Sequence, residues 1–180
     1  MVIEAHWLLP PELMEPAWQV YREAFEELRT RAVQRHVMLR GEFDEQMRDA
    51  RIRKYVVRDP SDGRMLALAT LTNDLGAMPL VSPDYFEYRW PALYAERRIW
   101  YCGFYAIHPE HQGSATFVRL VTEMRAVIAP GIAVMDFCGR NEEVRRMPQV
   151  VRTILARQGD VRPERLDAQA YWSYEFPAAS

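Results

Sequence analysis

Apolar residues in the first part of the chain recur every three or four positions, which is the period of an α-helix. This spacing predicts an amphipathic helix over 12–28 that begins after Pro10 and Pro11, because proline is tolerated in a first helical turn. A short apolar segment at 3–9 predicts a strand before this helix. A more polar segment at 43–51 predicts a second helix after it.

Two apolar runs follow at 54–58 and 65–71, and the turn between them reads D-P-S-D-G-R. Because Pro, Asp and Gly favour tight turns, these runs predict an antiparallel hairpin. The next connection, 72–97, holds three prolines and five aromatic residues. Long connections are often functional, so we expect this one to pack down as a lid or a pocket wall, with a short helix at 91–96.

Strands and helices alternate in the rest of the chain. Apolar runs at 99–108 and 132–138 predict two strands, with a helix at 115–128 between them. The short links imply that these two strands are parallel and joined by a right-handed crossover. We expect two further elements, a helix that Pro148 can kink and a final strand, at 142–157 and 168–176.

The composition predicts one globular domain over residues 1–180, since 49% of the residues are apolar. The 23 basic residues nearly balance the 25 acidic ones, which argues against strong attraction to nucleic acid or to an anionic membrane. No segment approaches the ~18 apolar residues of a membrane span, and no signal-peptide pattern is present. We therefore expect a cytoplasmic monomer or homodimer with reduced cysteines at Cys102 and Cys138.

The segment 104–117 connects the strand at 99–108 to the helix that follows. It reads F-Y-A-I-H-P-E-H-Q-G-S-A-T-F, in which Gln112 opens a loop of small residues. In this segment, and in element order over nearly the whole chain, the sequence resembles the GNAT superfamily of N-acyltransferases. It departs from the family pattern at Ala115, where the family has Gly, and at Phe117, where the family has Gly or Ala. The resemblance implies an α/β (α+β) fold: a twisted, mostly antiparallel mixed sheet of six to seven strands, one parallel βαβ unit and four helices.

The resemblance also implies a reaction, in which a small amine directly attacks the thioester of acetyl-CoA or a longer acyl-CoA in a ternary complex. The aromatic residues around the strand at 99–108 are similar to those of the acyl-homoserine-lactone and N-acyl amino acid synthase branch, which implies acyl carrier protein as an alternative donor and partner. In the family, a backbone N–H near Ala106 and Ile107 polarises the thioester carbonyl, and the loop N–H groups bind phosphate. The residues that the resemblance places against the cofactor are Ala106, Ile107, His108, Gln112, Gly113, Ser114, Ala115, Thr116, Phe117 and Asn141.

Three side chains are candidates for catalysis. Asp136 interrupts an apolar strand, so it is either a general base or a strand-end carboxylate that is solvated or paired with an arginine. Tyr105 either protonates the leaving thiolate or packs in the core. His108 either relays a proton or belongs to the turn. The aromatic residues expected in the substrate pocket are Tyr85, Trp90, Trp100 and Tyr101.

Several alternatives stay open. Asn141 either contacts the pantetheine arm or caps a helix. Arg140, Arg145 and Arg146 are either solvated or face an anionic cofactor or a carrier protein. A protein with this fold can also bind a ligand without turning it over, which the bulky Phe117 favours, or process a thioester by hydrolysis or decarboxylation.

Overall fold

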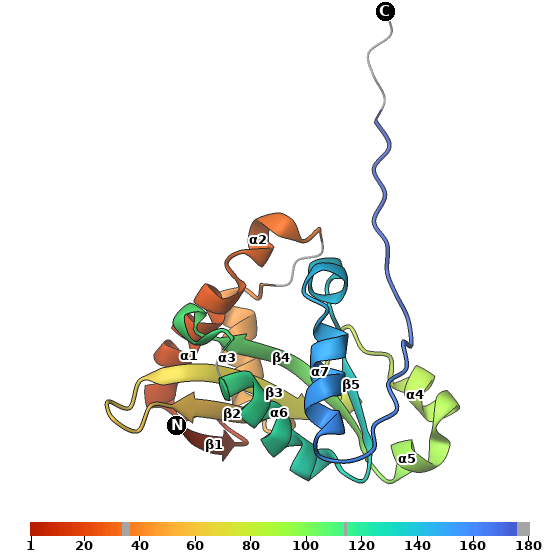
Figure 1. Ribbon diagram of the computed structural model, residues 1–180, viewed down its shortest axis with the longest axis horizontal. Coiled ribbons are helices and arrows are strands. Elements are labelled where there is room, and N and C mark those ends of the chain that lie inside the picture. Colours follow the sequence, from red (N-terminus) through yellow and green to blue (C-terminus); the bar gives the residue numbers. More distant parts are fainter. Residues whose placement is uncertain (34–36, 114, 176–180) are drawn as a thin grey trace, which may run out of the picture.

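The computed structural model describes residues 1–33, 37–113 and 115–175. Its centre is a five-stranded sheet in the order β1-β2-β3-β4-β5 (Figure 1). Neighbours from β1 to β4 are antiparallel, and β5 is parallel to β4. The strands are, in order, Val2–His6, Arg53–Arg58, Met65–Thr72, Ile99–Ile107 and Ile132–Met135.

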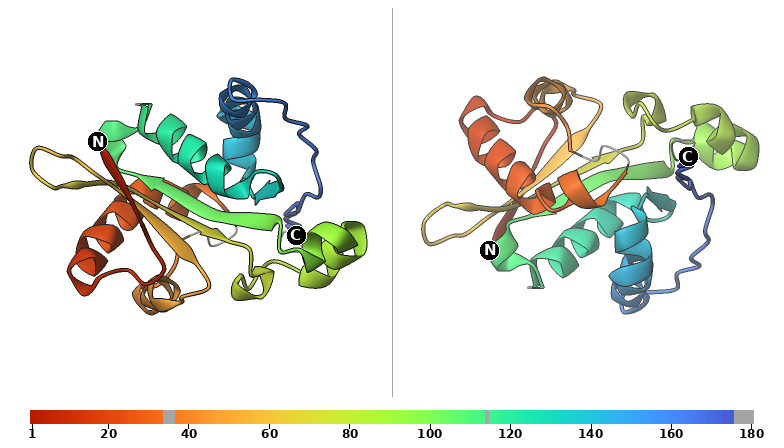
Figure 2. Two further views of the ribbon diagram at one scale, coloured as in Figure 1. Left: turned by 90° about the horizontal axis from the view of Figure 1, so that it is seen from below. Right: turned by 90° about the horizontal axis from the view of Figure 1, so that it is seen from above.

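Helices cover both faces of this sheet. α1 and α3 lie on one face, α6 and α7 lie on the other, and α4 and α5 pack at one end (Figure 2). The helices are Pro11–Phe25 (α1), Leu28–Arg31 (α2), Arg40–Arg48 (α3), Pro83–Arg89 (α4), Pro91–Ala95 (α5), Ala115–Ile128 (α6) and Met147–Ala156 (α7). Shorter turns are Leu75–Ala77 (η1), Pro109–His111 (η2) and the π-helical turn Arg140–Val144 (η3).

Each face of the sheet buries its own apolar core, as expected for strands with helices on both sides. On one face Ala17 and Tyr21 of α1 pack with Phe43 of α3. On the other, Leu120 and Met124 of α6 pack against the sheet. No helix in the described part of the chain is long and apolar enough to cross a membrane.

The joint between β4 and β5 shapes the molecule. The two strands pair from Ile99–Ile132 to Cys102–Met135, and the pairing then stops. At the same level β4 carries an extra residue, Gly103, opposite the Thr70–Leu71 step of β3. A β-bulge of this kind bends a strand and increases its twist. The rest of β4 therefore presents an unpaired edge toward the space beyond β5.

The sequence predicted α6 and the β2–β3 hairpin well, and the short helix expected at 91–96 is α5. The strand count was wrong: the described residues form five strands rather than six to seven, and more helical segments than four. The expected last strand is absent over 168–175, where the chain is exposed and runs clear of the sheet (Figure 1). Alternating residues form a strand only where a neighbouring strand accepts the backbone hydrogen bonds. Phe176 lies outside the described residues.

The helix expected at 142–157 is also two elements. Arg146 adopts a left-handed conformation with φ of 50°, which separates η3 from α7. Pro148 then lies in the first turn of α7, where proline is tolerated, and does not kink a longer helix.

Candidate functional site

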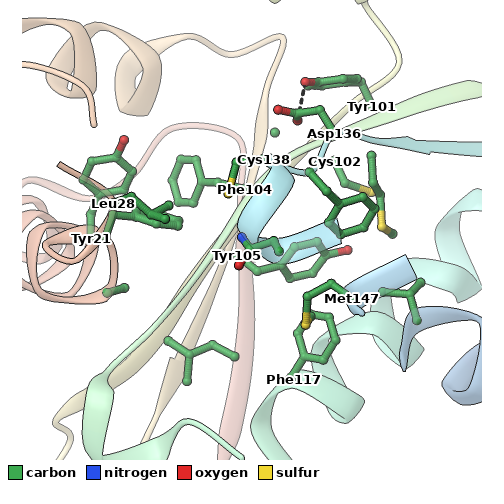
Figure 3. A pocket seen from close by; sticks show the side chains of 18 of the residues that line it. Tyr21, Leu28, Tyr101, Cys102, Phe104, Tyr105, Phe117, Asp136, Cys138 and Met147 are labelled. Carbon is green, nitrogen blue, oxygen red and sulfur yellow. Dashed lines mark hydrogen bonds between the residues drawn. The ribbon is translucent and has the colours of Figure 1, made fainter. Parts of the chain in front are cut away.

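A cavity of about 1390 Å³ opens where β4 and β5 separate. Tyr21 and Leu28 line it on the α1 side, and Phe117 and Met147 line it on the α6–α7 side (Figure 3). Phe104 of β4 lies between the two groups (Figure 3). The cavity therefore continues from one face of the sheet to the other past the unpaired edge of β4, and most of its wall is apolar.

The Tyr101–Asp136 pair lies at the point where the two strands part. The Tyr101 hydroxyl donates a hydrogen bond of 2.6 Å to Oδ1 of Asp136 (Figure 3). Burial, and then the neighbouring carboxylate, raises the pKa of Tyr101, so its hydroxyl keeps the proton. β5 ends at Met135, so Asp136 follows the strand and is exposed, which corrects the expectation of a carboxylate inside a buried strand. An oriented carboxylate open to a cavity can accept a proton from a bound amine.

Tyr105 points into the other part of the cavity. Its hydroxyl is buried and makes no hydrogen bond of normal geometry with a described residue, although it lies beside the Cys102 thiol. Burial raises the pKa of Tyr105 well above its ordinary value, and that of Cys102 to about 12. A buried hydroxyl without a hydrogen-bond partner lowers the stability of the fold unless a bound ligand supplies the missing hydrogen bond. The Cys102 thiol stays protonated at neutral pH, which argues against a nucleophilic role.

The loop before α6 carries the predicted cofactor residues. Gln112, Gly113 and Phe117 line the cavity, whereas Ala115 is exposed at the helix start and Thr116 is buried. Gly113 has a φ of +80°, a conformation that other residues rarely adopt. Ser114 lies outside the described residues.

Phe117 fills part of this end of the cavity. Its ring packs edge-on against Tyr105, with 5.3 Å between ring centroids. This bulky side chain therefore occupies space beside the loop that a glycine or alanine at the same position would leave open.

The other predicted site residues are divided between the cavity and its surroundings. Ile107 and Asn141 line the cavity, and Oδ1 of Asn141 is buried with no partner among the described residues. Ala106 is fully buried within the sheet. His108 lies outside the lining, with Nε2 at 3.2 Å from Glu23 and Nδ1 accepting from the Glu110 N–H.

Of the aromatic residues expected in the substrate pocket, Tyr101 alone lines the cavity within the described residues. Trp100 packs toward α6, and Trp90 packs with Phe86 at the end of the sheet. Tyr85 is exposed on α4. The long connection still contributes a wall, through a segment the sequence did not single out: Met78, Pro79, Leu80 and Val81.

A second cluster outside the cavity has residues of the kind that bind metals. His108, Glu110 and His111 offer ligand atoms within 4.8 Å of one another. However, Arg64 contacts both Glu110, at 3.1 Å, and His111, at 3.2 Å. A permanent positive charge at this distance opposes cation binding.

Glu27 is the functional candidate that sequence reasoning missed. It follows α1 and lines the cavity opposite η3, where it pairs with Arg140 and Arg145. These partners are more than 100 positions away in the sequence, so no local pattern could have revealed the contact.

The comparisons with known proteins are sparse. No family model matches the chain, and no curated protein matches its sequence. Among solved structures, a tetramutant of the BH1408 protein from Bacillus halodurans matches with a TM-score of 0.50 and 11% identity over 94% of this chain and 100% of that one. This match shows a shared fold.

Two further structures match more weakly. A single mutant of BH1408 has a TM-score of 0.48 and 12% identity over 95% of this chain and 100% of that one. A ribosomal-protein-alanine N-acetyltransferase from Brucella melitensis biovar Abortus 2308 has a TM-score of 0.46 and 10% identity over 94% of this chain and 99% of that one.

Proposed function

We propose that this protein is a GNAT-type N-acyltransferase that moves an acyl group from acyl-CoA, or from acyl carrier protein, to a small amine. The observation that carries the proposal is the parted β4–β5 pair. Its pairing ends at Cys102–Met135, and a cavity of about 1390 Å³ begins at the same level. The order of elements from β1 to α7 and the loop before α6 agree with the resemblance seen in the sequence.

Different groups of the chain can serve the separate steps of such a reaction. Asp136, oriented by Tyr101, lies where it can take the proton of the attacking amine. Tyr105 keeps its proton and can donate a hydrogen bond to the leaving sulfur. The unpaired edge of β4 supplies backbone N–H groups of the kind that stabilise a developing oxyanion.

The residues present fit a coenzyme A thioester, which would supply the activated acyl carbonyl when bound. The apolar wall suits a pantetheine arm, and the orphaned Asn141 Oδ1 is an acceptor for its amide. The start of α6, a helix of 14 residues, offers N–H groups for phosphate. A carrier protein would present the same arm without the nucleotide, so Phe117 obstructs it less.

The first test is thermal unfolding with acetyl-CoA, octanoyl-CoA and free CoA, followed by thiol release with a panel of amines. A ligand at 100 times its Kd stabilises the folded state by about 2.7 kcal/mol. For a domain of this size that raises Tm by roughly 5–10 °C. Acyl-dependent stabilisation and amine-dependent thiol release are expected, with acyl carrier protein as donor in a parallel arm. Neither effect with either donor would overturn the proposal.

A second candidate function is ligand binding without turnover, and the position of Phe117 against Tyr105 favours it. The Phe117→Ala variant distinguishes the two functions. If acyl-CoA stabilises both proteins and neither releases thiol with any amine, from acyl-CoA or from acyl carrier protein, the protein binds acyl thioesters without turning them over. If both bind and both release thiol, acyl transfer stands.

A further inference from the structure

Glu27 lines the cavity directly before α2, and it pairs with two guanidinium groups, one from Arg145 of the lining and one from Arg140 of η3. Nη2 of Arg140 donates to one carboxylate oxygen at 2.9 Å, and Nη2 of Arg145 donates to the other at 2.7 Å. Arg31 of α2 also pairs with Glu27. Figure 1 shows α2 and the helical turn above α7 facing each other across the top of the molecule. One carboxylate thus spans the groove between two walls.

The guanidinium groups around Glu27 outnumber its single carboxylate, which favours binding of an anion. Three guanidinium groups, from Arg31, Arg140 and Arg145, share the carboxylate of Glu27. Nε of Arg140 is also buried with no hydrogen-bond partner among the described residues. An unused buried donor near a cavity is a place where a ligand gains a hydrogen bond without displacing an existing partner.

We propose that Arg140 and Arg145 bind the carboxylate of the acceptor, so that the amine substrate is an amino acid, and that Glu27 occupies this subsite when no acceptor is bound. This inference rests on the proposed acyl transfer and names its substrate class. The two Nη2 groups donate to the two oxygens of the Glu27 carboxylate. Charge-assisted hydrogen bonds between arginine and a carboxylate use this geometry. The side chains of Glu27, Arg140 and Arg145 are 38%, 32% and 43% exposed, so their mutual attraction is weak enough for a ligand to displace Glu27.

The test compares binding of matched acids and amides and does not depend on turnover. The ligands are N-octanoylglycine, N-octanoylleucine and the two corresponding amides, which resemble reaction products with and without the carboxylate. The variants are Glu27→Gln, which frees the arginines, and Arg145→Gln, which removes one of them. Glu26→Gln is the matched control, because Glu26 pairs with Arg29 on its own helical turn and lies outside the cavity lining.

We expect the acids to bind about tenfold more tightly to Glu27→Gln than to the natural protein, and about tenfold more weakly to Arg145→Gln. The amides should show neither change, and Glu26→Gln should behave as the natural protein does. Thermal unfolding of each variant without ligand shows that it is folded. Equal binding of acid and amide, an unchanged affinity in Glu27→Gln, or binding of neither compound would overturn the subsite.

Two further comparisons distinguish a failure of this inference from a failure of the proposed acyl transfer. They also distinguish an acceptor carboxylate from the phosphates of the donor. If octanoyl-CoA binds and is turned over while acid and amide bind equally, acyl transfer stands and the carboxylate subsite falls. If neither octanoyl-CoA nor octanoyl acyl carrier protein acts as a donor while the acids respond to Glu27→Gln, the anion subsite stands and the proposed reaction falls. If Glu27→Gln tightens adenosine 3′,5′-bisphosphate in place of the acids, the arginines serve the donor's phosphates and the acceptor assignment is wrong.

Discussion

Asp136 shows how one hydrogen bond turns an exposed carboxylate into a positioned one. A carboxylate at the end of a strand is free to rotate in solvent, but the buried Tyr101 hydroxyl fixes one of its oxygens at 2.6 Å. The second oxygen is then available to the cavity. Tyr101 thus holds the Asp136 carboxylate in place through one oxygen. The other oxygen can take part in the proton transfer that we propose for Asp136.

Replacing Asp136 by Asn tests this assignment. The amide oxygen can still accept from Tyr101, so we expect the free energy of unfolding to change by less than about 0.5 kcal/mol. The amide cannot take a proton, so amine-dependent thiol release should fall roughly 10²-fold or more at unchanged donor affinity. Asp84→Asn, on α4 and outside the cavity lining, is the control and should keep the full rate. An undiminished rate in Asp136→Asn would assign the proton transfer elsewhere.

Lys54 is the chain's single lysine, and it is fully buried. Its ammonium donates to the backbone carbonyls of Trp7, at 2.9 Å, and of Asp49, at 2.6 Å, tying the segment after β1 to the end of α3. Burial lowers its pKa to about 8, and Asp49 opposes the shift. Since a neutral amine still carries two N–H donors, both hydrogen bonds survive deprotonation.

The depressed pKa of Lys54 predicts that stability rises with pH. Between pH 8 and the ordinary lysine pKa, the unfolded chain binds the proton that the folded protein has lost, so raising the pH favours folding. Against a Lys54→Met variant measured in parallel, the stability of the natural protein should gain about 2 kcal/mol from pH 7.5 to 9.5. Urea denaturation at intermediate pH values gives the difference. Parallel curves for the two proteins would mean that Lys54 stays charged when buried.

At the scale of the element, β4 owes its shape to Gly103. A Cβ built on Gly103 would lie 2.6 Å from Oγ1 of Thr70, closer than real contacts of this kind. The glycine lets the bulge sit tightly against β3 just where pairing with β5 ends. The groove therefore depends on a lining residue that has no side chain.

Gly103→Ala should lower the free energy of unfolding by about 1–3 kcal/mol, because the added methyl group must push β3 and β4 apart. Oγ1 of Thr70 is buried with no hydrogen-bond partner in the described part of the chain, so removing it as well in Thr70→Ala should recover most of this loss. Gly41→Ala is the matched control: a Cβ there meets nothing within 4 Å, and alanine favours the helix. Additive effects of Gly103→Ala and Thr70→Ala would show that the contact is not the cause.

The elements also show where sequence reasoning ends. α6 was predicted at its observed bounds, because helical spacing is a local property and Pro130 and Gly131 end it. The strand expected over 168–176 has the right alternation, but a strand is completed by its neighbour, and the described residues provide none. Periodicity indicates which face of an element is apolar; it does not indicate which element lies opposite.

At the scale of the whole molecule, the candidate site could be predicted in part. Gln112 and Gly113 were singled out through a local resemblance and Asp136 through a break in an apolar run, and all three line the cavity. The apolar wall from α1 and the bridge from Glu27 to η3 were not singled out, because they arise when segments far apart in sequence meet across a sheet. His108 follows its strand just as Asp136 does, yet only Asp136 lines the cavity.

The β4–β5 joint also divides the sheet into parts of unequal strength. Antiparallel pairing runs through β1 to β4, whereas β5 is held by the short register from Ile99–Ile132 to Cys102–Met135. Local opening follows the weakest contacts of a fold. Amide hydrogens of β5 should therefore exchange with solvent faster than those of β2 and β3, at a free energy below that of global unfolding. Hydrogen exchange read by mass spectrometry or NMR measures this, and equal protection across the sheet would contradict it.

The weak joint has a consequence for anything that enters the groove. A ligand lying between the parted strands would contact the antiparallel part of the sheet on one side and the β5 side on the other. It would therefore connect the two parts of the sheet where the β4–β5 pairing has ended. Binding would thus slow the exchange of the β5 amide hydrogens. A bound ligand would therefore make the unfolding of β5 more cooperative with that of the rest of the sheet.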